Sequence, residues 1–60
     1  MEKYLIERIK EINEEIKEAQ DMIEELDDIR EINILYNLIN RKVGEINSYK
    51  DILNRIKKDR

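Results

Sequence analysis

The chain has 60 residues, of which 40% are apolar and 45% are charged, and its formal net charge is −3 at pH 7. This length allows a single domain, residues 1–60, whose core is near the lower limit for independent stability. Because the chain contains no Cys and no His, it has no thiol nucleophile, no disulfide, no imidazole base and no Cys- or His-based zinc site. We therefore expect no enzymatic activity, no catalytic residues, no metal and no cofactor.

The opening residues and the hydropathy pattern bear on cellular location. Residues 1–7 lack the apolar core of a signal peptide. No apolar run is longer than three residues, whereas a membrane-spanning helix needs about 20. Ile, Asn, Lys and Tyr, whose codons are AT-rich, supply 28 of the 60 residues, which is typical of low-GC bacteria and their phages. We expect a cytoplasmic protein with no membrane partner.

Apolar residues in the first half of the chain recur at alternating steps of four and three, which is the heptad pattern of a helix with one apolar stripe. The stripe consists of Leu5, Ile9, Ile12, Ile16, Ala19, Ile23 and Leu26. This pattern predicts a helix over about 3–26.

The heptad pattern is interrupted between Leu26 and Ile29, where a step of three replaces the expected step of four. In a continuous helix this shift would rotate the apolar stripe by about 100°. Asp28, followed three residues later by Glu31, resembles a capping box, in which a side chain accepts hydrogen bonds from the free N–H groups of a new helix. We therefore expect a tight turn at about 26–29.

A second apolar stripe follows the turn and predicts a helix over about 29–58. Its members are Ile29, Ile32, Tyr36, Ile39, Val43, Ile46 and Leu53, with Lys50 as a polar interruption. The segment 41–44 followed by Ser48 is also compatible with a helix stop and a new start. Because the apolar pattern continues through Gly44, we expect a continuous helix with a weak point there. A break at Gly44 and one long helix without the turn are the alternatives.

Folding the chain at the turn brings positions whose numbers sum to 55 to the same level. In this register Ile12 meets Val43 and Ala19 meets Tyr36. The smallest apolar residue then faces the largest, as a packed interface requires. The two stripes therefore predict an antiparallel helical hairpin.

The charge distribution supports the same fold. Residues 1–28 carry four cations and eleven anions, whereas residues 29–60 carry eight cations and four anions. An antiparallel hairpin sets the acidic half beside the basic half, and exposed ion pairs of this kind select an orientation more than they stabilise it. The predicted pairs are Lys10–Glu45, Glu14–Arg41 and Glu25–Arg30.

The second helix carries a further apolar stripe that does not face the first helix, so one hairpin alone leaves it exposed. This stripe consists of Leu35, Leu38, Tyr49, Ile52 and Ile56. Small scaffolds often gain stability by oligomerising, and two hairpins related by a twofold axis form the simplest closed assembly. The predicted fold is therefore all-α: a helical hairpin that self-associates into a coiled-coil-like bundle, with a dimeric four-helix bundle favoured.

The uncovered stripe predicts a function in protein–protein interaction, as a small non-enzymatic regulator or assembly factor that acts as a homo-oligomer. If the stripe is the homodimer interface, a further partner would use the acidic outer face of the first helix or the basic tail, and the sequence leaves both open.

The basic C-terminal half supports two alternative functions: binding of nucleic-acid phosphates, and binding of a small anion or nucleotide by the oligomer. The candidate contacts are Arg41, Lys42, Arg55, Lys57 and Lys58. The acidic first helix and the negative net charge disfavour nucleic acid as a partner.

Overall fold

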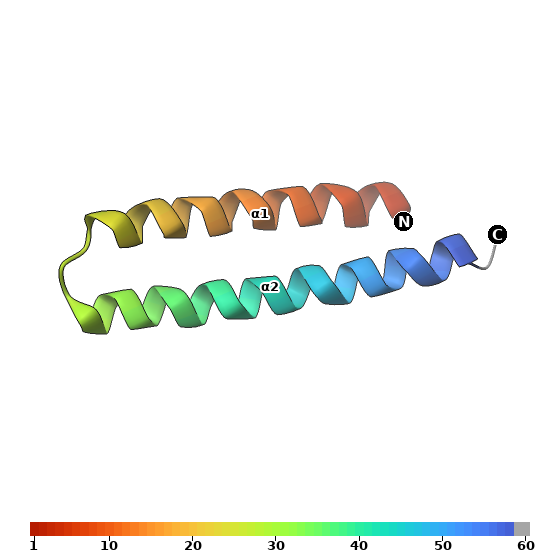
Figure 1. Ribbon diagram of the computed structural model, residues 1–60. Helices are drawn as coiled ribbons and strands as arrows, with labels where there is room; N and C mark the ends of the chain where they lie inside the picture. The colour runs from red at the N-terminus through yellow and green to blue at the C-terminus, as the bar shows by residue number, and fades with distance from the viewer. Residues whose placement is uncertain (59–60) are drawn as a thin grey trace.

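The computed structural model describes residues 1–58, which form two α-helices and a short connection. Helix α1 spans Glu2–Glu25 and helix α2 spans Ile29–Lys58. The helices run side by side in opposite directions, so the start of α1 and the end of α2 lie at the same end of the molecule (Figure 1). The predicted helical hairpin is confirmed, and the observed helix bounds agree with the predicted ones to within one residue.

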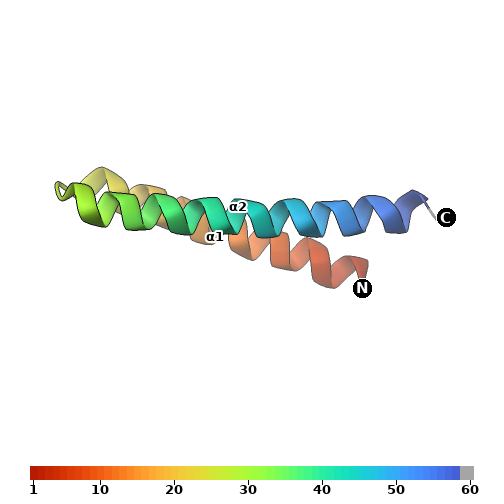
Figure 2. The ribbon, with the colours of Figure 1, turned by 90° about the horizontal axis from the view of Figure 1, so that it is seen from below.

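The hairpin is a rod with extents of 49 × 15 × 11 Å. A view from below shows that α1 and α2 cross at a shallow angle (Figure 2). Such an arrangement is typical of two helices packed along heptad stripes.

The connection between the helices is closed by three hydrogen bonds. Leu26 has extended backbone angles (φ −93°, ψ 140°), and its N–H donates to the carbonyl of Ile23 at 3.2 Å. The Asp28 carboxylate accepts a hydrogen bond from the backbone N–H of Arg30 at 2.9 Å, and the Asp28 carbonyl accepts from Ile32 at 3.0 Å. Asp28 therefore caps α2, as the sequence predicts.

Helix α2 continues through Gly44 without interruption. The Ser48 hydroxyl donates a hydrogen bond to the Gly44 carbonyl at 3.1 Å, one helical turn away. A Cβ atom at Gly44 would meet no atom within 4 Å. The glycine therefore makes no close helix contact that requires it, and the alternative of a helix break at this position is wrong.

The core is a single row of residues from each helix. Six apolar residues are buried, at intervals of seven within each helix: Leu5, Ile12, Ala19, Ile39, Ile46 and Leu53. The half-buried rows beside them are Ile9, Ile16 and Ile23 on α1, and Leu35, Lys42, Tyr49 and Ile56 on α2. These rows form the two-sided seam expected of an antiparallel coiled coil.

The predicted pairing between the stripes is wrong on α2. Tyr36 and Val43, which were expected in the seam, are 52% and 42% exposed. Their place is taken by the row that contains Lys42, because α2 is rotated about its own axis relative to the prediction.

The three predicted ion pairs between the helices are likewise absent from residues 1–58, where Glu15 binds Lys42 instead. In the predicted register, the numbers of facing residues sum to 55, whereas 15 and 42 sum to 57. The helices are therefore also shifted along each other by two residues relative to the prediction.

Candidate interaction surface

Most of the exposed apolar side chains lie on two opposite faces of the hairpin. We assign residues to these faces from their position relative to the buried rows, because residues seven apart share one side of a helix. The face that we name the Leu38 face contains Met22, Ile34, Leu35, Leu38, Tyr49, Ile52 and Ile56. The face that we name the Tyr36 face contains Ile6, Ile9, Ile16, Ile23, Ile29, Tyr36 and Val43.

All five residues of the predicted interaction stripe lie on the Leu38 face. Leu38 and Ile52 are each 38% exposed. Leu35, Tyr49 and Ile56 are half-buried, because their row also contributes to the seam with α1. The stripe is therefore partly used inside the hairpin and partly open to solvent.

Near the turn, the Leu38 face forms a groove of about 250 Å³. The groove is lined by Met22, Leu26, Glu31, Ile34 and Leu35. Met22 and Ile34 were not part of the predicted stripe, although they are 54% and 66% exposed. Met22 lies on α1 and becomes a neighbour of Leu35 only when the two helices are paired. Ile34 precedes Leu35 in α2 and lies one turn from Leu38, so the apolar pattern of α2 alone could have identified it.

The centre of the Leu38 face carries an ion pair between the helices. The Lys42 ammonium donates a hydrogen bond to the Glu15 carboxylate at 2.5 Å, and the two side chains are 21% and 41% exposed. Further along α1, one to two turns from Glu15, the Arg8 guanidinium donates to the Glu11 carboxylate at 3.1 Å. The apolar parts of this face are thus separated by a polar cluster.

The polar cluster shifts the titration of two of its members. The hydrogen bond from Lys42, with further attraction to Lys42 and Arg8, lowers the pKa of Glu15 below its ordinary value of 4.5. The pKa of Arg8 is raised, mainly by its hydrogen bond to Glu11 and also by the Tyr49 side chain. Both shifts favour the charged forms of Glu15 and Arg8.

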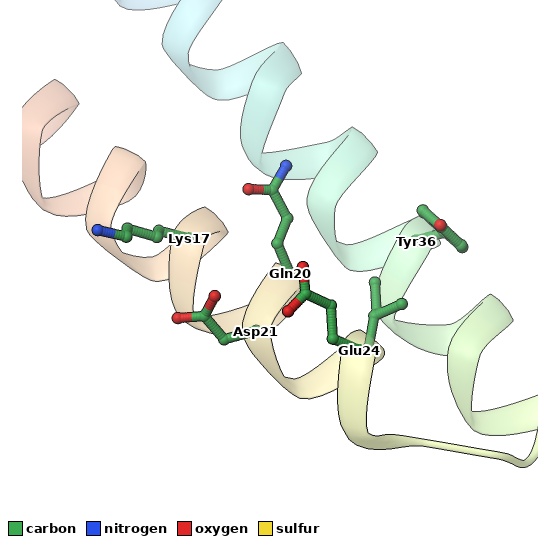
Figure 3. Close-up of a pocket in the computed structure, with 6 residues that line it drawn as sticks. Lys17, Gln20, Asp21, Glu24 and Tyr36 are labelled. Atoms are coloured by element: carbon green, nitrogen blue, oxygen red, sulfur yellow. The ribbon is translucent and has the colours of Figure 1, made fainter.

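The Tyr36 face contains a more polar groove of about 400 Å³. It is lined by Lys17, Gln20, Asp21, Ile23, Glu24 and Tyr36. Figure 3 shows that the Tyr36 ring comes from α2, whereas the labelled charged and amide side chains come from α1. We predicted that the Tyr36 ring faces Ala19. In the structure this ring lies at the side of the groove.

The candidate anion contacts do not form one cluster. Lys42 is half-buried and paired with Glu15. Arg41 and Arg55 are exposed along one edge of the Leu38 face, but 14 residues of helix separate them by about 21 Å. Helical geometry places Lys57 and Lys58 on other sides of α2. The structure therefore brings together the predicted apolar stripe but not the predicted basic contacts.

Two further properties concern the described part of the chain. Within residues 1–58, neither helix combines the length and the low polarity needed to cross a lipid bilayer. In the same range, no three side chains of metal-binding type are grouped so that they could hold an ion.

The described features define a helical hairpin with two exposed apolar faces. No protein-family model, no curated protein and no solved structure matches the chain.

Proposed function

We propose that this chain is a non-enzymatic protein–protein interaction module that acts as a homo-oligomer, in the role of a regulator or assembly factor. The observation that carries the proposal is the exposure of large apolar side chains along the Leu38 face, including Met22, Ile34, Leu38 and Ile52. Exposed apolar patches rimmed by polar residues are characteristic of surfaces that bind other proteins, and the Leu38 face carries one such patch on each side of the ion pair between Glu15 and Lys42.

The accessible surface of the hairpin supports the proposal. It amounts to 5114 Å², whereas a compact folded monomer of 7.4 kDa has about 4,200 Å². Within residues 1–58, only six of the 24 apolar residues are buried, and Ile12 is the one that is fully inaccessible. A chain with so small a core gains stability when a partner covers more of its apolar surface.

The polar side chains of the Leu38 face support a binding role more than a catalytic one. Glu15 and Lys42 neutralise each other, and Arg8 is occupied by Glu11. A catalytic acid or base near neutral pH needs a pKa close to the working pH, but the pKa of Glu15 moves away from neutrality and so does that of Arg8. We therefore assign these groups to structure and to specificity of association.

The oligomeric state tests the proposal directly. Size-exclusion chromatography with light scattering should give a mass at least twice the 7.4 kDa of one chain at micromolar concentration. A mass of one chain across the micromolar range would contradict the proposed homo-oligomer.

A pair of variants on α2 locates the interface. Leu38→Glu should weaken association, because it places a charge on the apolar Leu38 face. Val43→Glu is the matched control, since Val43 has similar exposure (42%, against 38% for Leu38) but lies on the Tyr36 face. Circular dichroism should show that both variants remain helical. If Val43→Glu dissociates the oligomer and Leu38→Glu does not, the Leu38 face is not the interface.

A further inference from the structure

The two helices of the hairpin carry opposite charge. Helix α1 has nine carboxylates and four basic side chains, whereas α2 has seven basic side chains and three carboxylates. Within one hairpin, the opposite charges of the two helices meet in the ion pair between Glu15 and Lys42. Most of the remaining charge lies on exposed positions, where it can act on a partner.

The outer edges of the Leu38 face repeat this asymmetry. The edge on α1 carries the carboxylates of Glu11, Glu18 and Glu25, which are seven residues apart. The edge on α2 carries the guanidinium groups of Arg41 and Arg55. All five side chains are exposed. The face therefore has an acidic edge on one helix and a basic edge on the other. Between these edges lie its apolar residues, the ion pair between Glu15 and Lys42, and the carboxylates of Glu31 and Glu45.

Two copies of such a face can be stacked around a twofold axis in two ways. If the axis is parallel to the helices, both turns lie at the same end and each α1 lies against α2 of the other copy. If the axis is perpendicular to the helices, the turns lie at opposite ends and each helix lies against its own equivalent. The second arrangement sets the two acidic edges together and the two basic edges together, which costs free energy through like-charge repulsion.

The positions of the charged residues along the helix axis also favour the first arrangement. The ion pair between Glu15 and Lys42 indicates which residues of α1 and α2 lie at similar levels. A twofold axis parallel to the helices allows no shift along them, so the same levels apply between copies. Glu18 then lies within two residues, about 3 Å, of the level of the partner subunit's Arg41.

We propose that a second copy of this chain covers the Leu38 face with the two turns at the same end, so that each acidic α1 lies against the basic α2 of the other copy. This proposal rests on the homo-oligomeric function proposed above and specifies its geometry. A face of 49 by 15 Å offers about 700 Å², close to the ~800 Å² that each partner contributes to an interface of standard size. One such dimer is a closed four-helix bundle in which all neighbouring helices are antiparallel.

Spin labels at the turn distinguish the two arrangements. The chain has no cysteine, so Asp27→Cys provides a single attachment site in the exposed connection. Pulsed electron paramagnetic resonance should give a distance on the order of 20 Å between the two labels of a dimer, about two interaxial separations. Opposite-end stacking would instead give a distance near the 49 Å length of the rod.

The outcomes separate this proposal from the proposed function. A dimeric mass with the long distance overturns the same-end geometry and leaves the homo-oligomer intact. A monomeric mass overturns both. Glu14→Cys, near the middle of α1 on its outer side, is the control position, because its label distance is similar in both arrangements.

A charge exchange tests the edge contact itself. Arg41→Glu should weaken the dimer by about tenfold, since it sets like charges against each other at two symmetric contacts. Adding Glu18→Lys should restore most of the affinity, measured by sedimentation equilibrium. If the double variant is helical but associates no better than Arg41→Glu alone, the proposed contact between Glu18 and the partner's Arg41 is refuted.

Discussion

The Glu15 carboxylate on α1 accepts a hydrogen bond from the Lys42 ammonium on α2, so residues 27 positions apart in the sequence are joined across the hairpin. Lys42 occupies the half-buried row of α2 that otherwise holds Leu35, Tyr49 and Ile56. A lysine can occupy such a seam position because its apolar stem packs along the interface while its charged end reaches an acidic partner. The pair is therefore specific to the observed level and rotation of α2 relative to α1.

This ion pair predicts a defined pH dependence of stability. Since the folded state lowers the pKa of Glu15 below 4.5, its contribution is complete at pH values above 4.5 and is lost as the pH falls through the lowered pKa. We expect Glu15→Gln to melt at a lower temperature than the parent at pH 7. The difference should shrink as the pH is lowered from 4.5 towards 2.

Thermal melting followed by circular dichroism measures this difference. Glu14→Gln is the matched control, because Glu14 is an exposed neighbouring carboxylate that forms no ion pair with residues 1–58. Its melting temperature should differ little from that of the parent at any pH. An equal effect of the two variants would show that general charge, and not the pair with Lys42, governs the pH dependence.

The sequence predicts the hairpin well because its local signals agree. The heptad stripe of the first half, the slip after Leu26 and the capping residue Asp28 all concern neighbouring residues, and all three correspond to observed features. Local patterns of this kind depend on backbone geometry that is the same in every helix.

The rotation of α2 is not predictable from the apolar pattern alone. The buried row of Ile39, Ile46 and Leu53 has a mixed row on each side. One neighbouring row holds Ile29, Tyr36, Val43, Lys50 and Lys57, and the other holds Leu35, Lys42, Tyr49 and Ile56. Each row has three apolar residues and is interrupted by lysine, so the number of apolar residues does not separate them. The choice depends on long-range contacts with α1, of which the pair with Glu15 is the clearest.

The same ambiguity limits prediction of the interaction surface. The predicted stripe lies on one face, but three of its five members also contribute to the seam. Met22 and Ile34 complete the exposed part of that face, and their proximity depends on the pairing of the two helices.

Gly44 offers a test of the continuous helix. Because Gly44 is in the interior of α2 and a Cβ there would meet no atom within 4 Å, Gly44→Ala should stabilise the fold by about 0.5–1 kcal/mol. Urea unfolding should show a higher midpoint with an unchanged slope. A lower midpoint would indicate that the native backbone at this position is not helical.

Asp28 offers a test of the turn. Its carboxylate accepts the hydrogen bond of the Arg30 N–H at 2.9 Å, so Asp28→Ala should destabilise the fold by about 1 kcal/mol. Asp28→Asn should retain most of the stability, because an amide oxygen can accept the same hydrogen bond. Asp27→Ala is the control in the same connection, and its effect in urea unfolding should be smaller. Equal losses at Asp27 and Asp28 would contradict the capping role.

Ile12 offers a test of the core, because among residues 1–58 it is the one side chain with no accessible surface. Ile12→Val removes a single buried methylene-sized group and should cost about 1 kcal/mol, whereas Ile12→Ala should cost about 2–5 kcal/mol, which is enough to unfold a chain of this size. Ile12→Val is the smaller change, so this variant should still fold and its melting temperature can be measured. Ile29→Val is the matched control, since Ile29 is 73% exposed and should tolerate the same change with little effect on thermal melting. If the two valine variants melt at the same temperature, Ile12 does not lie in the packed seam between α1 and α2.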